Sequence, residues 1–141
     1  MTTRTVFFAV LAAASLPAAA QTMQPGQWEF TTTMTSPMMP QPQVGTASKC
    51  VSKEEANDPA SFMGGDNAAG CNITRGESAP GSYSWTIACE KQGVTGTGKA
   101  WYGPDKIESD IRMTVALQGG GQKIEMTNRT VGRYVGPCTA K

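Results

Sequence analysis

The chain has 141 residues, of which 16% are charged, with a formal net charge of +1 and no histidine. This length is room for one domain. A nucleic-acid binder needs a basic surplus to displace counterions from phosphate, and a membrane-surface binder needs a basic or amphipathic face, so we expect neither class. The lack of histidine also excludes Ser-His-Asp catalysis, Cys-His catalysis and imidazole metal sites.

The first twenty residues have the pattern of a secretory signal peptide. Arg4 supplies a positive charge, residues 6–16 are almost wholly apolar, and the segment ends in small alanines at the positions that a signal peptidase reads. The apolar run is about half of the roughly 20 residues that a membrane-spanning helix needs. We expect cleavage after Ala20, which leaves residues 21–141 as a single β-rich domain that is periplasmic or secreted, with no membrane span and eleven residues of each charge.

The next segments alternate apolar and polar side chains, which is the period of an antiparallel sheet with one buried and one wet face. Trp28, Phe30 and Met34 alternate in this way near the start of the domain. In residues 106–117 the odd positions are apolar except for Ser109, and the even ones are mostly charged. Gly- and Pro-rich turns separate the segments. We predict seven strands, at 26–35, 43–50, 70–77, 82–90, 93–102, 106–117 and 122–134, the last five forming a meander.

One short helix is expected over residues 53–57. Ser52-Lys53-Glu54-Glu55 has the S-x-x-E capping box, and Pro59 ends the turn that follows. Glu54 and Glu55 are then first-turn charges favoured by the helix dipole.

The four cysteines all lie in the exported part, and an even number in an oxidising compartment predicts two disulfides. A hairpin that turns around Pro80 sets Cys71 opposite Cys89 and Arg75 opposite Trp85. Opposed residues of antiparallel strands have Cα atoms about 4.5–5.5 Å apart, which suits a disulfide. We therefore predict the pair Cys71–Cys89, and Cys50–Cys138 by exclusion. The spacings contain no C-x-x-C and fit no zinc site, so neither a metal site nor a redox dithiol is expected.

Gly96 and Gly98 lie on one face of the strand predicted at 93–102. Glycines inside a strand usually mark strong bending or the close approach of another backbone or a ligand. Bending is the commoner cause, and it favours a curved sheet. The predicted fold class is mainly β: a curved antiparallel meander of about seven strands, closed partly or fully into a barrel, with one short helix and two disulfides.

Carboxylates could still carry out paired acid–base work without histidine. Most of them fall on the polar faces of the predicted strands, where solvated surface is expected. They are Glu29, Glu90, Glu108, Asp110 and Glu125. We therefore expect no catalytic residue, no enzymatic activity and no resident cofactor or metal.

Methionine and tryptophan side chains are the candidates for contact with a ligand or partner: Trp28, Met34, Met38, Met39 and Trp101. The three methionines lie within six positions, beside or in a Pro-rich connection at 35–43. Thioethers can bind Cu(I), and they also form adaptable apolar surfaces. The prolines hold this connection extended, which spaces the side chains apart rather than gathering them.

Several short motifs follow one another along residues 23–138. They are Met23-Gln24-Pro25-Gly26-Gln27-Trp28-Glu29, Met38-Met39-Pro40, Lys49-Cys50, Gly70-Cys71, Trp85-x3-Cys89, Gly96-Thr97-Gly98 and Gly136-Pro137-Cys138. In this order they make the chain resemble the small secreted bacterial domain-of-unknown-function family 3617. The resemblance implies a periplasmic or secreted β-rich domain and supplies no catalytic residues.

The leading functional hypothesis is a non-enzymatic module that binds a small apolar ligand or a periplasmic protein. It would use a barrel-like cavity, or the Met-Pro connection with nearby aromatics. One alternative is an inhibitor of lysozyme-type cell-wall hydrolases, which would project a rigid polar loop such as 66–70 or 119–121. The other is a copper-handling protein that uses Met34, Met38 and Met39.

Overall fold

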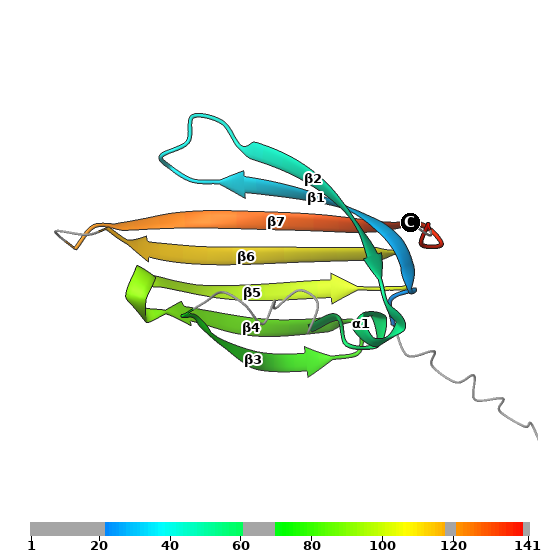
Figure 1. Ribbon diagram of the computed structural model, residues 1–141. Helices are drawn as coiled ribbons and strands as arrows, with labels where there is room; N and C mark the ends of the chain where they lie inside the picture. The colour runs from blue at the N-terminus through cyan, green and yellow to red at the C-terminus, as the bar shows by residue number, and fades with distance from the viewer. Residues whose placement is uncertain (1–21, 61–69, 118–120, 140–141) are drawn as a thin grey trace, which may run out of the picture.

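The computed structural model describes residues 22–60, 70–117 and 121–139 (Figure 1). The signal peptide expected at 1–20 lies outside these residues, as do residues 66–69 and 119–120 of the two loops considered for an inhibitor. Within the described part of the chain, no helix is both long enough and apolar enough to cross a membrane.

Seven antiparallel strands form one sheet in the order β2-β1-β7-β6-β5-β4-β3. Their bounds are β1 Gly26–Thr35, β2 Gln43–Val51, β3 Asn72–Ala79, β4 Ser82–Cys89, β5 Val94–Tyr102, β6 Lys106–Ala116 and β7 Lys123–Gly136. The predicted strands and the meander from β3 to β7 are confirmed, with ends that lie within two residues of the predicted ones. Because β2 and β3 form the two edges, the sheet is curved but not closed.

The sheet has an inner face, on which the core and the helix α1 (Lys53–Asn57) lie (Figure 1). Two clusters of buried side chains form this core, and Tyr102 packs against both of them. The first contains Met23, Trp28, Phe30, Val51, Ala56 and Ile107, and the second contains Tyr83, Trp85 and Ala100. The core therefore lies at the end of the sheet that α1 covers.

Helix α1 begins with the predicted capping box. The Ser52 hydroxyl accepts a hydrogen bond from the Glu55 backbone N–H at 3.2 Å, and the Glu55 carboxylate accepts one from the Ser52 N–H at 3.0 Å. Lys49 Nζ lies 2.8 Å from Glu55 Oε1. The hydrogen bonds from Lys49 and from the Ser52 backbone hold the pKa of Glu55 below its ordinary value. This short helix buries only Ala56 and is fixed mainly by its cap.

Glycines let large core side chains lie against neighbouring strands. A Cβ on Gly98 would overlap the indole ring of Trp85, which lies opposite it on β4. A Cβ on Gly132 would lie 2.5 Å from the Phe30 ring and 2.6 Å from Ile107. The glycine at 98 is therefore required by the close approach of a neighbouring side chain, whereas the sequence had favoured bending as the reason.

Replacing Gly98 by alanine is expected to lower the free energy of unfolding by about 1–3 kcal/mol, because the added methyl group displaces the buried Trp85 ring. Urea unfolding followed by tryptophan fluorescence measures this loss. Gly45→Ala is the matched control, since Gly45 also lies in a strand and a Cβ there meets no atom within 4 Å. Equal stabilities of the two variants would contradict the explanation.

Candidate functional site

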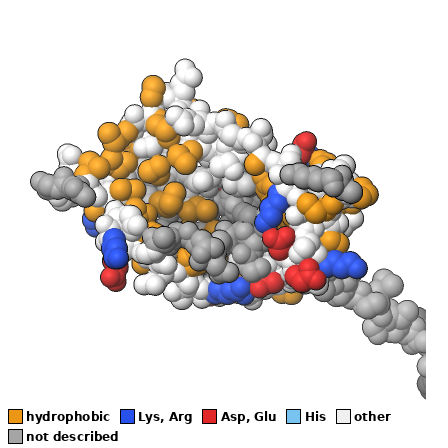
Figure 2. Space-filling view, in the orientation of Figure 1, with side chains coloured by type: hydrophobic (Ala, Val, Ile, Leu, Met, Phe, Trp, Pro, Cys, Tyr) orange, Lys and Arg blue, Asp and Glu red, His pale blue; other side chains and the backbone are white. Residues whose placement is uncertain are grey.

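The inner face remains apolar beyond the core, toward the end of the sheet away from α1. Strand alternation places further apolar side chains on this face, and we call the six of them on β1, β6 and β7 the apolar patch: Met34, Ile111, Met113, Val115, Ile124 and Met126. Met113 lies directly opposite Met126 across β6 and β7. All six side chains are only half-buried. Figure 2 shows apolar side chains gathered on this face, at the left of the view, over the end of the sheet that α1 does not reach.

Polar side chains interrupt this face between the core and the patch. The Thr32 and Thr130 hydroxyl groups hydrogen-bond to each other at 3.0 Å across β1 and β7. Ser109 is 1% exposed, and its hydroxyl oxygen has no hydrogen-bond partner among the described residues. The side-chain carbonyl oxygen of Asn128 is also buried, without a partner within residues 22–60, 70–117 and 121–139. Native proteins rarely leave such atoms unsatisfied, so both call for an explanation.

The sequence carried one signal for this polar group. Ser109 is the only break in the apolar row of residues 106–117. Asn128 begins an Asn-x-Thr sequon, to which we assign no role, and no other pattern in the sequence marked it as a site residue, because its importance comes from its neighbours on β1 and β6. Asn128 lies opposite Met34 on one side and Ile111 on the other.

Charged side chains of the central strands lie on the outer face. Glu108 on β6 pairs with Lys106 on the same strand and with Arg129 on β7, and Arg129 also reaches Asp110. The hydrogen bond from Lys106 is the main cause that holds the pKa of Glu108 below its ordinary value. Among the described residues, no group of three His, Cys, Asp or Glu side chains could hold a metal ion. The inner-face positions of β1, β4, β5, β6 and β7 carry no charged residue.

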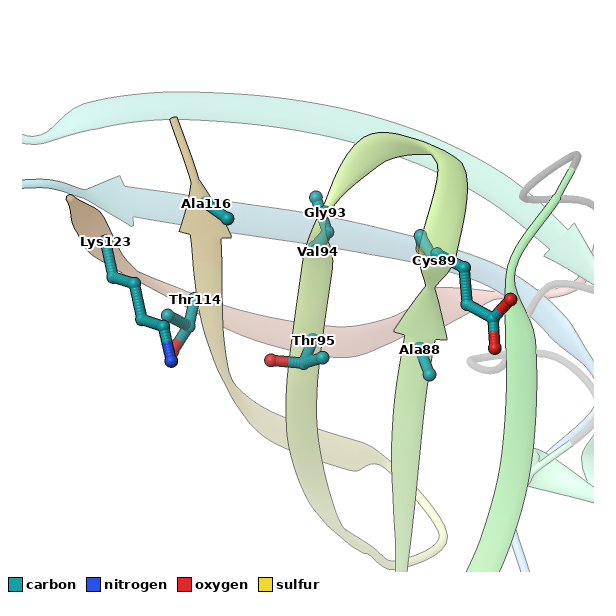
Figure 3. Close-up of a pocket in the computed structure, with 9 residues that line it drawn as sticks. Ala88, Cys89, Gly93, Val94, Thr95, Thr114, Ala116 and Lys123 are labelled. Atoms are coloured by element: carbon teal, nitrogen blue, oxygen red, sulfur yellow. The ribbon is translucent and has the colours of Figure 1, made fainter. Parts of the chain in front are cut away.

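A hollow of about 200 Å³ lies between the ends of β4, β5, β6 and β7 (Figure 3). Short side chains line much of it, among them Ala88, Thr95 and Thr114, and Lys123 lies at its border. Pockets that hold drug-sized ligands measure about 300–1,000 Å³. This hollow is smaller than those pockets, although most of its lining is apolar. The apolar patch is therefore the stronger candidate site.

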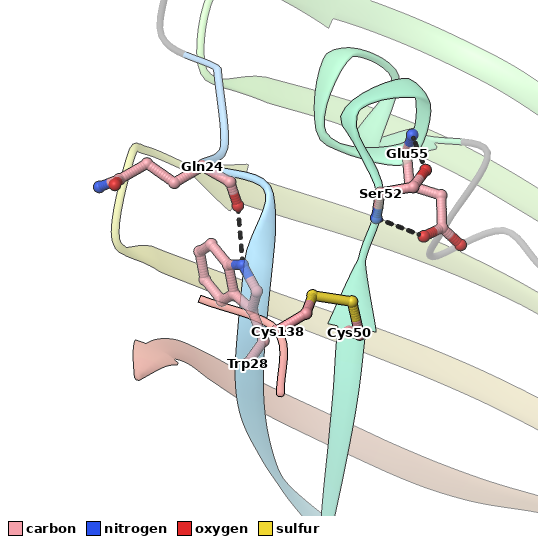
Figure 4. The surroundings of a disulfide bond; sticks show 6 residues. All are labelled: Gln24, Trp28, Cys50, Ser52, Glu55 and Cys138. Carbon is pink, nitrogen blue, oxygen red and sulfur yellow. Dashed lines mark hydrogen bonds between the residues drawn. A yellow bond between two sulfur atoms is a disulfide. The ribbon is translucent and has the colours of Figure 1, made fainter. Parts of the chain in front are cut away.

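Trp28 belongs to the core. Its side chain is 0% exposed and its indole N–H donates a hydrogen bond to the Gln24 carbonyl oxygen at 2.9 Å (Figure 4). Its ring packs edge-on against Tyr134, with 5.9 Å between the ring centroids. In this arrangement Trp28 supports the inner face and has no surface for a ligand.

The disulfides join the pairs expected from the sequence, Cys50–Cys138 and Cys71–Cys89. Cys50, on β2, is linked to the segment after β7, and the two Cα atoms are 5.5 Å apart (Figure 4). Cys71 precedes β3 and is linked to the end of β4. The register that led to this pairing is also present, because Arg75 lies opposite Trp85.

The other predicted contact residues do not form one site. Trp101 is 42% exposed on the outer face, with Lys99 Nζ 5.3 Å from the centroid of its ring. Met38 is 71% exposed in the connection between β1 and β2, and Met39 is partly buried there, with its N–H bonded to the Ser36 carbonyl oxygen at 3.0 Å. Of the five candidates, Met34 alone lies in the apolar patch.

Comparison with known families matches residues 23–138 to the family described as "Protein of unknown function (DUF3617)". The chain belongs to the DUF3617 family. The match spans all seven strands, the helix and both disulfides of this DUF3617 protein. Comparisons with curated proteins and with solved structures give no significant match.

Proposed function

We propose that this DUF3617 protein is an exported, non-enzymatic binding protein whose apolar patch holds a small, mainly apolar ligand. The observation that carries the proposal is the row of half-buried apolar side chains that continues the inner face beyond the core. The two disulfides and the signal-peptide pattern support an oxidising compartment outside the cytoplasm.

The composition of the patch suits such a ligand. Three of its six members are methionines, whose unbranched thioether side chains adapt to irregular apolar shapes. Contact with a ligand removes apolar area from water, which contributes roughly 25 cal/mol per Å². The strand order places Met34, Met113 and Met126 on three neighbouring strands of the inner face.

The carboxylates support a non-enzymatic role. A general acid or base works best with a pKa near the ambient pH, which requires a carboxylate pKa raised by burial or by a like charge. Glu108 has the opposite shift, because Lys106 favours its ionised form. Asp110 shares Arg129 with it in the same solvated outer-face network.

Met126→Glu is expected to weaken binding of the uncharged fluorescent probe N-phenyl-1-naphthylamine by about tenfold or more, because it places a carboxylate among apolar side chains. Fluorescence titration of the mature protein measures the dissociation constant. Thr127→Glu is the matched control, since the neighbouring residue points to the outer face and should bind the probe as the unmodified protein does. A protein that fails to bind the probe, or equal loss in both variants, would exclude the proposal.

Native mass spectrometry of the protein isolated from its producing cells compares this proposal with the two alternatives. A bound apolar organic mass supports the proposal, and a bound copper ion supports the copper-handling hypothesis. Normal Cu(I) affinity after replacement of Met34, Met38 and Met39 by leucine would exclude that hypothesis. Unchanged activity of lysozyme-type enzymes with the protein in excess would exclude the inhibitor hypothesis.

A further inference from the structure

We infer that the ligand of the apolar patch carries an uncharged hydrogen-bonding head group, a hydroxyl or an amide, that binds at Asn128 and Ser109. Its apolar body lies along the methionines of the patch. This inference rests on the proposed function and adds the chemical class of the ligand.

Two polar atoms at this end of the core are unsatisfied. The Ser109 hydroxyl oxygen and the Asn128 side-chain carbonyl oxygen are buried, and neither has a hydrogen-bond partner in the part of the chain that the structure describes. The nearby Thr32 and Thr130 hydroxyl groups satisfy each other. A buried carbonyl oxygen without a donor costs free energy, whereas a ligand hydroxyl or amide N–H would supply that donor.

The two unsatisfied atoms belong to residues on adjacent strands, between the core and the apolar patch. Ser109 is opposite Thr130, and Asn128 is opposite Ile111, on the adjacent strands β6 and β7. Asn128 is also opposite Met34 on β1. The polar atoms thus lie at the border between the closed core and the apolar patch. This is the usual plan of a small-molecule site, in which apolar walls surround a few polar groups that fix the orientation of the ligand.

The charge of the inner face limits the head group that can bind there. The inner-face positions of the five strands β1, β4, β5, β6 and β7 carry no Lys, Arg, Asp or Glu. On the edge strands, Lys49 lies opposite Trp28 and Arg75 lies opposite Trp85, and these two cations pair with Glu55 and Asp58 at the α1 end of the sheet. A carboxylate or ammonium head group would therefore be buried without a counter-charge, which is strongly unfavourable. The geometry favours a neutral head group over the ionised head of a fatty acid or of a cationic amphiphile.

Three probes with the same twelve-carbon chain test the inference: monolauroylglycerol, laurate and dodecyltrimethylammonium. Each probe is titrated, below the critical micelle concentration of that probe, against N-phenyl-1-naphthylamine bound to the mature protein. The competition gives three dissociation constants. We expect monolauroylglycerol to bind about tenfold more tightly than either charged probe. Asn128→Leu should weaken monolauroylglycerol by about tenfold and leave the affinity for N-phenyl-1-naphthylamine unchanged, because one hydrogen bond to the head group is lost.

Asn72→Leu is the matched control, since this asparagine is exposed on β3 and should alter no probe. Ser109→Ala is a second variant that changes the side-chain volume less, and it should also reduce the preference for monolauroylglycerol. Equal binding of all three chains, or a preference that survives both substitutions, would overturn the inference while leaving the proposed function in place. Failure of the unmodified protein to bind N-phenyl-1-naphthylamine would instead overturn the proposed function.

An ordered water molecule is the other way to satisfy the two buried atoms. In that case Asn128→Leu would expel the water, lower the melting temperature and leave the ratio of the three dissociation constants unchanged. The inference predicts the reverse, a melting temperature that rises without ligand and a ratio that falls. Calorimetric melting of Asn128→Leu and Asn72→Leu separates these two outcomes.

Discussion

Replacing Cys50 and Cys138 together by serine is expected to lower the free energy of unfolding by about 4.5 kcal/mol, because this disulfide closes a loop with a sequence separation of 88 residues. In the chain-entropy model this disulfide restricts the unfolded chain over most of the domain. It also links the edge strand β2 to the segment that follows β7. Urea unfolding of the oxidised protein and of the double variant measures the difference.

The second disulfide provides the comparison. Cys71 and Cys89 are separated by 18 residues, so replacing both by serine should cost about 3 kcal/mol in the same model. The order of the two losses is the informative result, because both variants carry the same chemical change. A larger loss for the Cys71–Cys89 pair would show that native packing, and not the unfolded chain, determines their contribution.

Trp28→Ala is expected to lower the free energy of unfolding by about 3–5 kcal/mol. The side chain is wholly buried, lies against Phe30 and Tyr134, and satisfies the Gln24 carbonyl oxygen. Its removal leaves a cavity in the core and an acceptor without its donor. The loss is a large fraction of the roughly 5–15 kcal/mol that stabilises a domain. Thermal and urea unfolding measure it.

Two further variants test the reason for this loss. Trp28→Phe keeps an aromatic ring but removes the hydrogen bond to Gln24, so its cost should be clearly smaller than that of Trp28→Ala. Trp101→Ala changes a side chain that is 42% exposed on the outer face and should cost about 1 kcal/mol or less. Similar losses for Trp28→Ala and Trp101→Ala would contradict the assignment of Trp28 to the core.

These variants also bear on the proposed site, because the two ends of the sheet differ. The end covered by α1 holds the wholly buried side chains, such as Trp28 and Ile107. The other end holds the half-buried patch, including Met113 and Met126. We expect substitutions in the patch to cost less stability than those in the core, since surface left partly open contributes less to folding. Loss of ligand binding can then be measured on folded protein.

The sequence by itself determined the features that depend on local patterns. Alternation of apolar and polar residues gave the seven strands, and the capping box at Ser52 gave the helix. The turn around Pro80 predicted the pairing of β3 with β4 and the pair Cys71–Cys89, although the register shifts between Arg75 and Ser78, which the local pattern did not indicate. Each of these signals extends over a few residues, so neighbouring positions contain all the information that is needed.

Only the tertiary structure decided which distant segments meet. The pairing of β1 with β7 places Met34 opposite Asn128, and the pairing of β6 with β7 places Met113 opposite Met126. The sequence had grouped Met34 with Met38 and Met39, because they are close along the chain. It had also grouped Trp28 with Trp101, which the curved sheet places in the core and on the outer face. The order of strands in a sheet depends on long-range packing, and this order assembles the patch and its two unsatisfied polar atoms.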